Sequence, residues 1–174
     1  MESEEIDDAM RASLSVNLPT STCQFKNILE IWGDPHEAST LIKGAESYEE
    51  KVSLSKQLAF HPQCWCFAHN RFCDVDSTSD VRAQGIPCVD WSQAGLGLGV
   101  NGPLLETALA AGAKAQETRT TMVILENVRN FKQHVAEDAY GESFDWQREL
   151  VDPADVGFEF TARQRIDFLF GNKF

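Results

Sequence analysis

The sequence predicts an α/β fold in which an incomplete open sheet is flanked by helices and preceded by a mostly helical, acidic part. Three observations indicate this. Residues 120–125 are nearly all apolar, as in the central strand of a parallel sheet. Residues 104–117 combine helix-favouring alanines with an apolar side. Between residues 34 and 60, apolar side chains recur at helical intervals.

Residues 1–60 are predicted to form the acidic N-terminal segment. Five carboxylates within residues 1–8 repel one another, which is typical of a solvated tail or a frayed helix start. Residues 13–22 contain Pro19 among serines and threonines and are predicted to be a linker. Residues 27–32 are too short for periodicity to separate a strand from a helix edge. Residues 34–60 are predicted to form two short helices, because Asp34 and Pro35 suit a helix start and Gly44 interrupts the pattern.

Residues 61–77 are predicted to be a loop rich in cysteine and histidine. It contains four potential soft metal ligands within ten residues, Cys64, Cys66, His69 and Cys73. The Cys-x-Cys start is tighter than the usual spacing of a structural zinc site, and the neighbouring aromatics suit buried packing equally well. We therefore favour a packed loop with reduced cysteines and no metal, and keep zinc as the weaker alternative.

Residues 78–174 are predicted to carry the chemistry. A short strand at residues 81–86 leads into Pro87 and Cys88, and catalytic groups of open α/β sheets lie just beyond such strand ends. A cysteine behind a rigid proline is a candidate nucleophile, whereas a buried thiol is the ordinary alternative. Residues 95–103 contain a G-x-G-x-x-G pattern, but it follows the Cys88 loop and not a strand, which favours a mobile loop over dinucleotide binding.

The rest of the chain is predicted to contain two further strands with a polar segment between them. The strand at residues 120–125 ends on Glu126, where a carboxylate faces the crevice more often than the core. Residues 130–146 are polar and predicted to be loop with some helix, and residues 166–170 are predicted to be a last strand. Arg163 and Arg165 stand just before that strand, a position where arginines are commonly surface charge.

Composition limits the classes of function. The chain has 174 residues, which suits one domain, and a formal net charge of -12, which argues against strong independent binding to nucleic acid. No apolar run approaches the ~20 residues that a membrane helix needs. Five cysteines, an odd number, without a secretory signal indicate a reducing compartment, so we expect an intracellular protein.

Three motifs in order resemble those of the cytosine-C5 DNA methyltransferase family. They are Pro87-Cys88 with Ser92 following, Glu126-Asn127-Val128, and Arg163-Gln164-Arg165. The resemblance covers residues 78–174 and implies an incomplete Rossmann-like methyltransferase sheet. It also implies S-adenosyl-L-methionine as cofactor and DNA as partner, in the nucleus if the source is eukaryotic.

The resemblance implies a role for each motif residue. Cys88 would add to C6 of cytosine, which activates carbon 5 for methylation. Glu126 would hydrogen-bond the ring, and Arg165 with Arg163 would contact the base oxygen or a phosphate. Pro87, Ser92 and Asn127 would shape the substrate site, and the target base would be flipped out of the helix.

The sequence departs from this family in several places. Val89 stands where glutamine is usual after Pro-Cys, and Trp91 stands where phenylalanine is typical. Residues 1–84 contain only Gly33 and Gly44, so the family's Phe-x-Gly-x-Gly cofactor turn is not found and the cofactor-binding residues are unknown. The prediction is thus a partial or divergent enzyme. The alternatives are a non-catalytic methyltransferase-like module that acts through a protein partner, or a protein similar to transfer-RNA cytosine methyltransferases.

Overall fold

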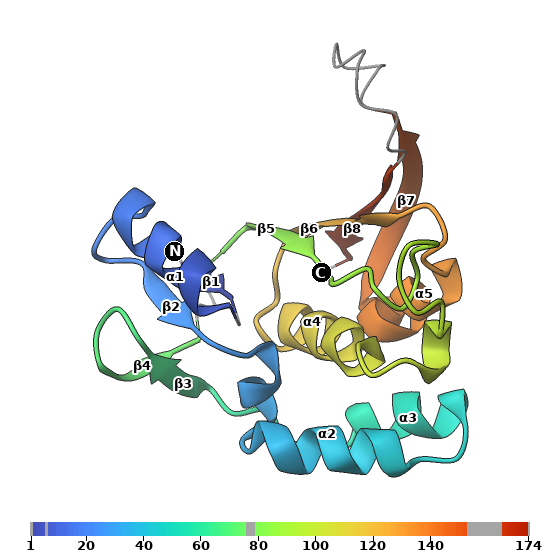
Figure 1. The fold of residues 1–174 in the computed structure, drawn as a ribbon, viewed down its shortest axis with the longest axis horizontal. Helices are drawn as coiled ribbons and strands as arrows, with labels where there is room; N and C mark the ends of the chain where they lie inside the picture. Colours follow the sequence, from blue (N-terminus) through green and yellow to red (C-terminus); the bar gives the residue numbers. More distant parts are fainter. Residues whose placement is uncertain (1, 6, 76–78, 153–164, 174) are drawn as a thin grey trace.

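The structure is a computed structural model that describes residues 2–5, 7–75, 79–152 and 165–173 (Figure 1). In chain order the elements are β1 (Glu2–Glu4), α1 (Asp8–Asn17), β2 (Cys23–Phe25), the 3-10 helix η1 (Ile28–Trp32), α2 (Pro35–Gly44), α3 (Tyr48–Ser55), β3 (Gln63–Cys66), β4 (Arg71–Asp74), β5 (Val81–Gly85), η2 (Gly99–Asn101), α4 (Leu105–Glu117), β6 (Met122–Val128), α5 (Gln133–Tyr140), η3 (Gly141–Ser143), β7 (Phe144–Val151) and β8 (Arg165–Asn172). The predicted α/β class is confirmed.

The main sheet has four strands in the order β5-β6-β8-β7. Strand β6 lies inside the sheet, as its apolar sequence predicts, but only its β5 neighbour is parallel. The expectation of a parallel environment is therefore wrong on the other side, where β8 runs antiparallel to both β6 and β7. The sequence did not reveal β7, because half of its residues are polar and Arg148 interrupts the apolar alternation of Phe144, Trp146 and Leu150.

Helices α4 and α5 cover one face of this sheet (Figure 1). Alternate residues of β6 and β8 point to that face and are fully buried, as expected for strands with one covered side. Tyr140 of α5 stacks on Phe170 of β8 with ring centroids 4.1 Å apart. The two helices approach so closely that a Cβ added to Gly112 would lie 2.1 Å from the carbonyl oxygen of Ala139. This close packing of α4 and α5 against β6 and β8 holds the ends of the two strands in fixed positions.

The N-terminal part contains the two helices predicted between residues 34 and 60. Asp34 caps α2 by accepting from the amides of His36 and Glu37, and α2 ends at Gly44. This contact with the two amides lowers the pKa of the Asp34 carboxyl, with the Glu37 amide contributing most. Helix α2 contacts α4 through Lys43, whose ammonium lies 3.2 Å from the buried Glu106 carboxylate.

Two local expectations for the N-terminal part were incomplete or wrong. Helix α1 includes residues 13–17 of the predicted linker, because the Asp7 carboxylate caps it by accepting from the amides of Ala9 and Met10. Residues 28–32 form a 3-10 helix, and Asn27 caps it. No helix within the described ranges is long and apolar enough to cross a membrane.

The predicted loop at residues 61–77 is largely a β-hairpin. Strands β3 and β4 pair antiparallel, with Cys64 opposite Cys73. The hairpin lies next to β2, where the amide of Phe67 donates to the carbonyl oxygen of Gln24 at 2.9 Å. Its Trp65 and Phe72 rings pack edge to face and are partly exposed. Prediction failed here because alternation over four residues is too short to distinguish a strand from a loop.

Candidate active site

Cys88 lies in a tight turn just beyond the carboxyl end of β5. The strand ends at Gly85, and the Cys88 carbonyl oxygen accepts from the amides of Trp91 and Ser92 at 3.0 and 2.8 Å. The side chain of Cys88 is half-buried and its thiol is free. This is the position at which open α/β sheets carry catalytic groups.

Trp91 anchors this turn to the sheet. Its buried ring lies edge to face on Phe131, 4.9 Å between centroids, and Phe131 in turn contacts Phe168 of β8 at 6.1 Å. The aromatic series runs from the Cys88 turn to the core beneath the sheet. A bulky ring at this position thus holds the backbone that carries Cys88.

The glycine-rich segment is attached to the same turn through Asp90. The Asp90 carboxylate is 1% exposed and accepts from the Leu104 amide at 2.8 Å, while its backbone oxygen accepts from the Gly99 amide at 2.8 Å. Gly102 passes so close that an added Cβ would lie 2.1 Å from this carboxylate. Gly97 and Gly99 adopt positive φ of 63° and 57°, which glycine tolerates best. The glycines serve the turn geometry, and this segment does not follow a strand as a dinucleotide loop would.

Glu126 lies on β6 directly beside the end of β5. It pairs in register with Gly85, and its partly exposed carboxylate forms an ion pair with Arg165, with Arg165 Nε 2.8 Å from Glu126 Oε1. Arg165 is the first residue of β8, on the neighbouring antiparallel strand. The fold therefore brings together two predicted site residues that are far apart in the sequence.

Asn127 has its side chain on the covered side of the sheet. It is 1% exposed, and its Nδ2 donates to the carbonyl oxygen of Ile86 at 3.0 Å, while its Oδ1 accepts from the Val128 amide at 2.8 Å. This links the end of β6 to the segment that enters the Cys88 turn. Asn127 thus fixes the spacing between the two strand ends that carry Cys88 and Glu126.

Asp167 is a carboxyl group that sequence reasoning missed. It faces Glu126 in the β6–β8 register, two residues from Arg165 and on the same face of the sheet. Burial raises the pKa of the Asp167 carboxyl, and the charge of Arg165 partly opposes this. Because Arg165 and Asp167 are two residues apart on one strand, the sequence could have indicated that both side chains lie on the same face of the sheet. Arg163 lies outside the described residues.

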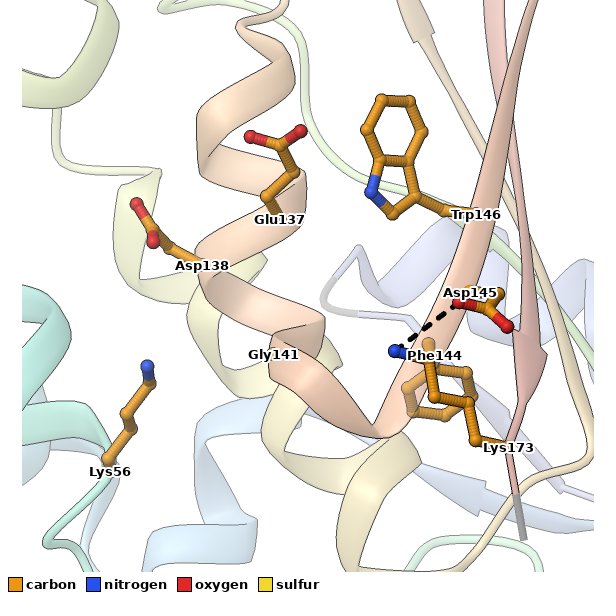
Figure 2. A pocket seen from close by; sticks show the side chains of 8 residues that line it. All are labelled: Lys56, Glu137, Asp138, Gly141, Phe144, Asp145, Trp146 and Lys173. Atoms are coloured by element: carbon orange, nitrogen blue, oxygen red, sulfur yellow. Dashed lines mark ion pairs between the residues drawn. The ribbon is translucent and has the colours of Figure 1, made fainter.

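Of two cavities in the described part of the chain, one lies far from this arrangement and one lies beside it. The larger, about 760 Å³, lies at the other end of the sheet between α3, α5, β7 and the end of β8 (Figure 2). There Lys173 pairs with Asp145 at 3.3 Å. The rest of the lining combines the charged Lys56, Glu137 and Asp138 with Gly141 and the aromatic Phe144 and Trp146. None of its lining residues was predicted as a site residue. Arg165 lies at the opposite end of β8 from this cavity.

The smaller cavity, about 420 Å³, runs along β5. Its lining includes residues 81–87 of β5 and the following turn, residues of α4, and the N-terminal residues Glu5, Lys26 and Asn27. Pro87 on its wall is the neighbour of Cys88. A cavity of this size suits a nucleoside-sized ligand. Its lining offers a carboxylate and an ammonium group for polar contacts, although the glycine turn of the resembled family is not part of it.

The cysteine and histidine residues of the hairpin form a second cluster. Cys66, His69 and Cys73 lie together as the sequence allowed, but Cys23 of β2 joins them instead of Cys64. Burial, followed by the neighbouring thiols of Cys73 and Cys66, raises the pKa of Cys23 to about 12. Burial opposes ionisation of Cys66 as well, yet backbone amides led by that of Gln24 lower its pKa.

Part of the chain matches the model of a known protein family, and its fold is similar to that of a solved structure. Residues 67–145 match the family model of the C-5 cytosine-specific DNA methylase. The Entamoeba histolytica methyltransferase EhMeth has a similar structure, with a TM-score of 0.55 and 15% sequence identity over 97% of this chain and 43% of that one. The S. pombe Dnmt2 methyltransferase gives a TM-score of 0.42 and 13% identity over 99% of this chain and 49% of that one. No curated protein matches.

The chain spans less than half the length of these two structures. At such low identity the likeness to EhMeth shows a shared fold, and the weaker likeness to the S. pombe protein adds nothing to it. The matched segment includes the Cys88 turn and the end of β6 with Glu126 and Asn127. The family match covers less than half of the chain, and with the shared fold it supports a partial or divergent member of the C-5 cytosine-specific DNA methylase family.

Proposed function

We propose that this chain takes part in the transfer of a methyl group from S-adenosyl-L-methionine to carbon 5 of cytosine in DNA. The single observation that carries the proposal is the ion pair between Glu126 and Arg165 beside the Cys88 turn, with Nε and Oε1 2.8 Å apart. The exocyclic amine, N3 and O2 of cytosine are neighbours along one edge of the ring. Two side chains that contact this edge must therefore adjoin, as these two do.

In this proposal the Cys88 thiolate adds to C6 of the flipped-out cytosine, and the electron pair of the C5–C6 bond shifts toward C5. Glu126 hydrogen-bonds N3 and the exocyclic amine, and Arg165 donates to O2, so that both stabilise the charge that develops in the ring. After methylation, transfer of the C5 proton to a water molecule expels the Cys88 thiolate from C6 and restores the aromatic ring. Asn127 and Trp91 keep the two strand ends in place throughout.

The bound cofactor would supply the electrophilic methyl group. We assign it to the cavity along β5, because Pro87 lies on the wall of that cavity next to Cys88. Within this lining, Lys26 could pair with the carboxylate of the cofactor and Glu5 could accept from its ribose hydroxyls. Calorimetry with the purified chain tests this directly, since Lys26→Ala should weaken binding severalfold.

The decisive test is covalent trapping. An oligonucleotide with 5-fluorocytosine at the target position cannot lose the C5 substituent, so the adduct with Cys88 should persist on a denaturing gel when the cofactor is present. Cys88→Ala should abolish the adduct, and Glu126→Gln should slow its formation by about 10²-fold or more. Asp145→Asn, at the opposite end of the sheet, should trap like the wild type. An adduct that survives Cys88→Ala would overturn the proposed role of Cys88.

A second candidate function is a non-catalytic module that acts through protein contacts. It is favoured by the position of β5, which is an edge strand of the four-stranded sheet formed by the described residues. The net charge of -12 also disfavours a nucleic-acid partner. If the folded wild-type chain neither binds the cofactor nor traps on DNA, this second function replaces the first. Trapping on 5-fluorocytidine RNA alone would instead identify an RNA methyltransferase.

A further inference from the structure

The cluster of Cys23, Cys66, His69 and Cys73 has the composition and geometry of a tetrahedral metal site. Their ligand atoms all lie within 4.8 Å of one another. His69 Nδ1 lies 3.6 Å from Cys23 Sγ, 3.3 Å from Cys66 Sγ and 3.4 Å from Cys73 Sγ. Zinc in a tetrahedron, with bonds of about 2.3 Å to sulfur and 2.0–2.1 Å to nitrogen, separates nitrogen from sulfur by about 3.6 Å and two sulfurs by about 3.8 Å.

Hydrogen bonds to His69 account for only part of this convergence. The far nitrogen of His69, Nε2, lies 3.1 Å from the carbonyl oxygen of Thr20 and can donate to it. Nδ1 is then unprotonated and presents a single lone pair to three thiols, so it can accept from only one of them. A histidine whose second nitrogen donates to a backbone carbonyl is the usual arrangement of a metal-binding imidazole.

The supporting backbone also fits a metal site. The Gln24 amide donates to Cys66 Sγ over 3.4 Å and so holds this sulfur in the cluster. Cys23 and His69 are 46 residues apart, so the cluster joins β2 to the β3–β4 hairpin. On the hairpin Phe67 and Phe72 are exposed, which leaves this region little apolar burial of its own. A cross-link is what such a small unit needs.

We propose that Cys23, Cys66, His69 and Cys73 bind one Zn²⁺ ion that joins β2 to the β3–β4 hairpin. Four protein ligands complete a tetrahedron and leave no open position, so the ion is structural and not catalytic. Soft thiolates with one imidazole select zinc over the oxygen-preferring magnesium and calcium. The site is independent of Cys88 and of the methyl-transfer proposal, and either can fail without the other.

Metal analysis of the purified, folded chain tests this inference. Elemental analysis should find about one zinc per chain, and replacement by Co²⁺ should produce the visible absorption of a tetrahedral cobalt–thiolate site. Cys23→Ser and Cys73→Ser should each reduce bound zinc severalfold. Cys64→Ser is the matched control, because Cys64 lies opposite Cys73 in the same hairpin but outside the cluster, and it should keep full metal content.

Two further measurements keep the test decisive if a serine variant does not fold. A thiol-modifying mercurial added to the wild-type chain should release zinc to a coloured indicator in proportion to the protein. Mass spectrometry after alkylation should find all five cysteines reduced once the metal is removed. A folded wild-type chain without zinc, a Cys66–Cys73 disulfide, or loss of metal in Cys64→Ser with retention in Cys23→Ser would each overturn the inference.

Discussion

At the scale of single residues, the contact between Gly102 and Asp90 controls the shape of the segment after Cys88. The Asp90 carboxylate is buried and accepts from the Leu104 amide, and no side chain larger than hydrogen fits at Gly102. Gly102→Ala should force the carboxylate away and lower the free energy of unfolding by roughly 1–3 kcal/mol. Urea denaturation measures this loss.

Gly44→Ala is the matched control for this substitution. Gly44 has no atom within 4 Å of an added Cβ, so alanine should leave the stability unchanged or raise it by about 0.4–1 kcal/mol. If both variants behave alike, the close contact at Asp90 does not limit residue 102.

At the scale of elements, the Cys88 turn depends on Trp91, which connects it through Phe131 to β8. Trp91→Ala removes a buried ring and should cost about 3–5 kcal/mol of stability. Trp91→Phe keeps a ring and should cost less than about 1.5 kcal/mol. Among the described residues the buried Trp91 Nε1 has no hydrogen-bond partner, which is a further reason for the mild effect of phenylalanine.

Thermal unfolding of the two Trp91 variants and the wild type gives the comparison. A Trp91→Phe variant as unstable as Trp91→Ala would show that the indole itself, and not ring packing, holds the turn.

At the scale of the whole molecule, the sheet has different roles on its two faces. One face packs on α4 and α5, while the other carries Glu126, Arg165 and Asp167 at the end nearest to Cys88. The net charge of -12 surrounds this arrangement with a repulsive field for nucleic acid. We therefore expect the isolated chain to bind a 20-base-pair duplex more weakly than the ~10⁻⁴–10⁻⁶ M typical of non-specific binders at physiological salt.

Fluorescence anisotropy at two salt concentrations checks this expectation. Micromolar binding with a steep salt dependence would contradict it, because such behaviour needs a concentrated basic surface.

The kinds of residue at the site and their local structural settings could be read from the sequence. The alternation of apolar strand segments with helical segments predicted the class of fold. The helix at residues 105–117 and the strand that carries Glu126 lie close to the residues that their patterns indicated. The resemblance selected Cys88, Glu126 and Arg165 from their motifs, since order along the chain needs no coordinates. Three of the four ligands of the proposed metal site were equally visible, because they are neighbours in the sequence.

Which of these residues come into contact depends on the three-dimensional fold. Arg165 reaches Glu126 because β8 pairs antiparallel with β6, a choice that depends on long-range strand pairing and not on local pattern. Cys23 replaces Cys64 in the cluster for the same reason, since β2 packs beside the hairpin although it lies 46 residues from His69. Contacts between distant segments depend on burial of the whole core, and a single sequence does not display that burial.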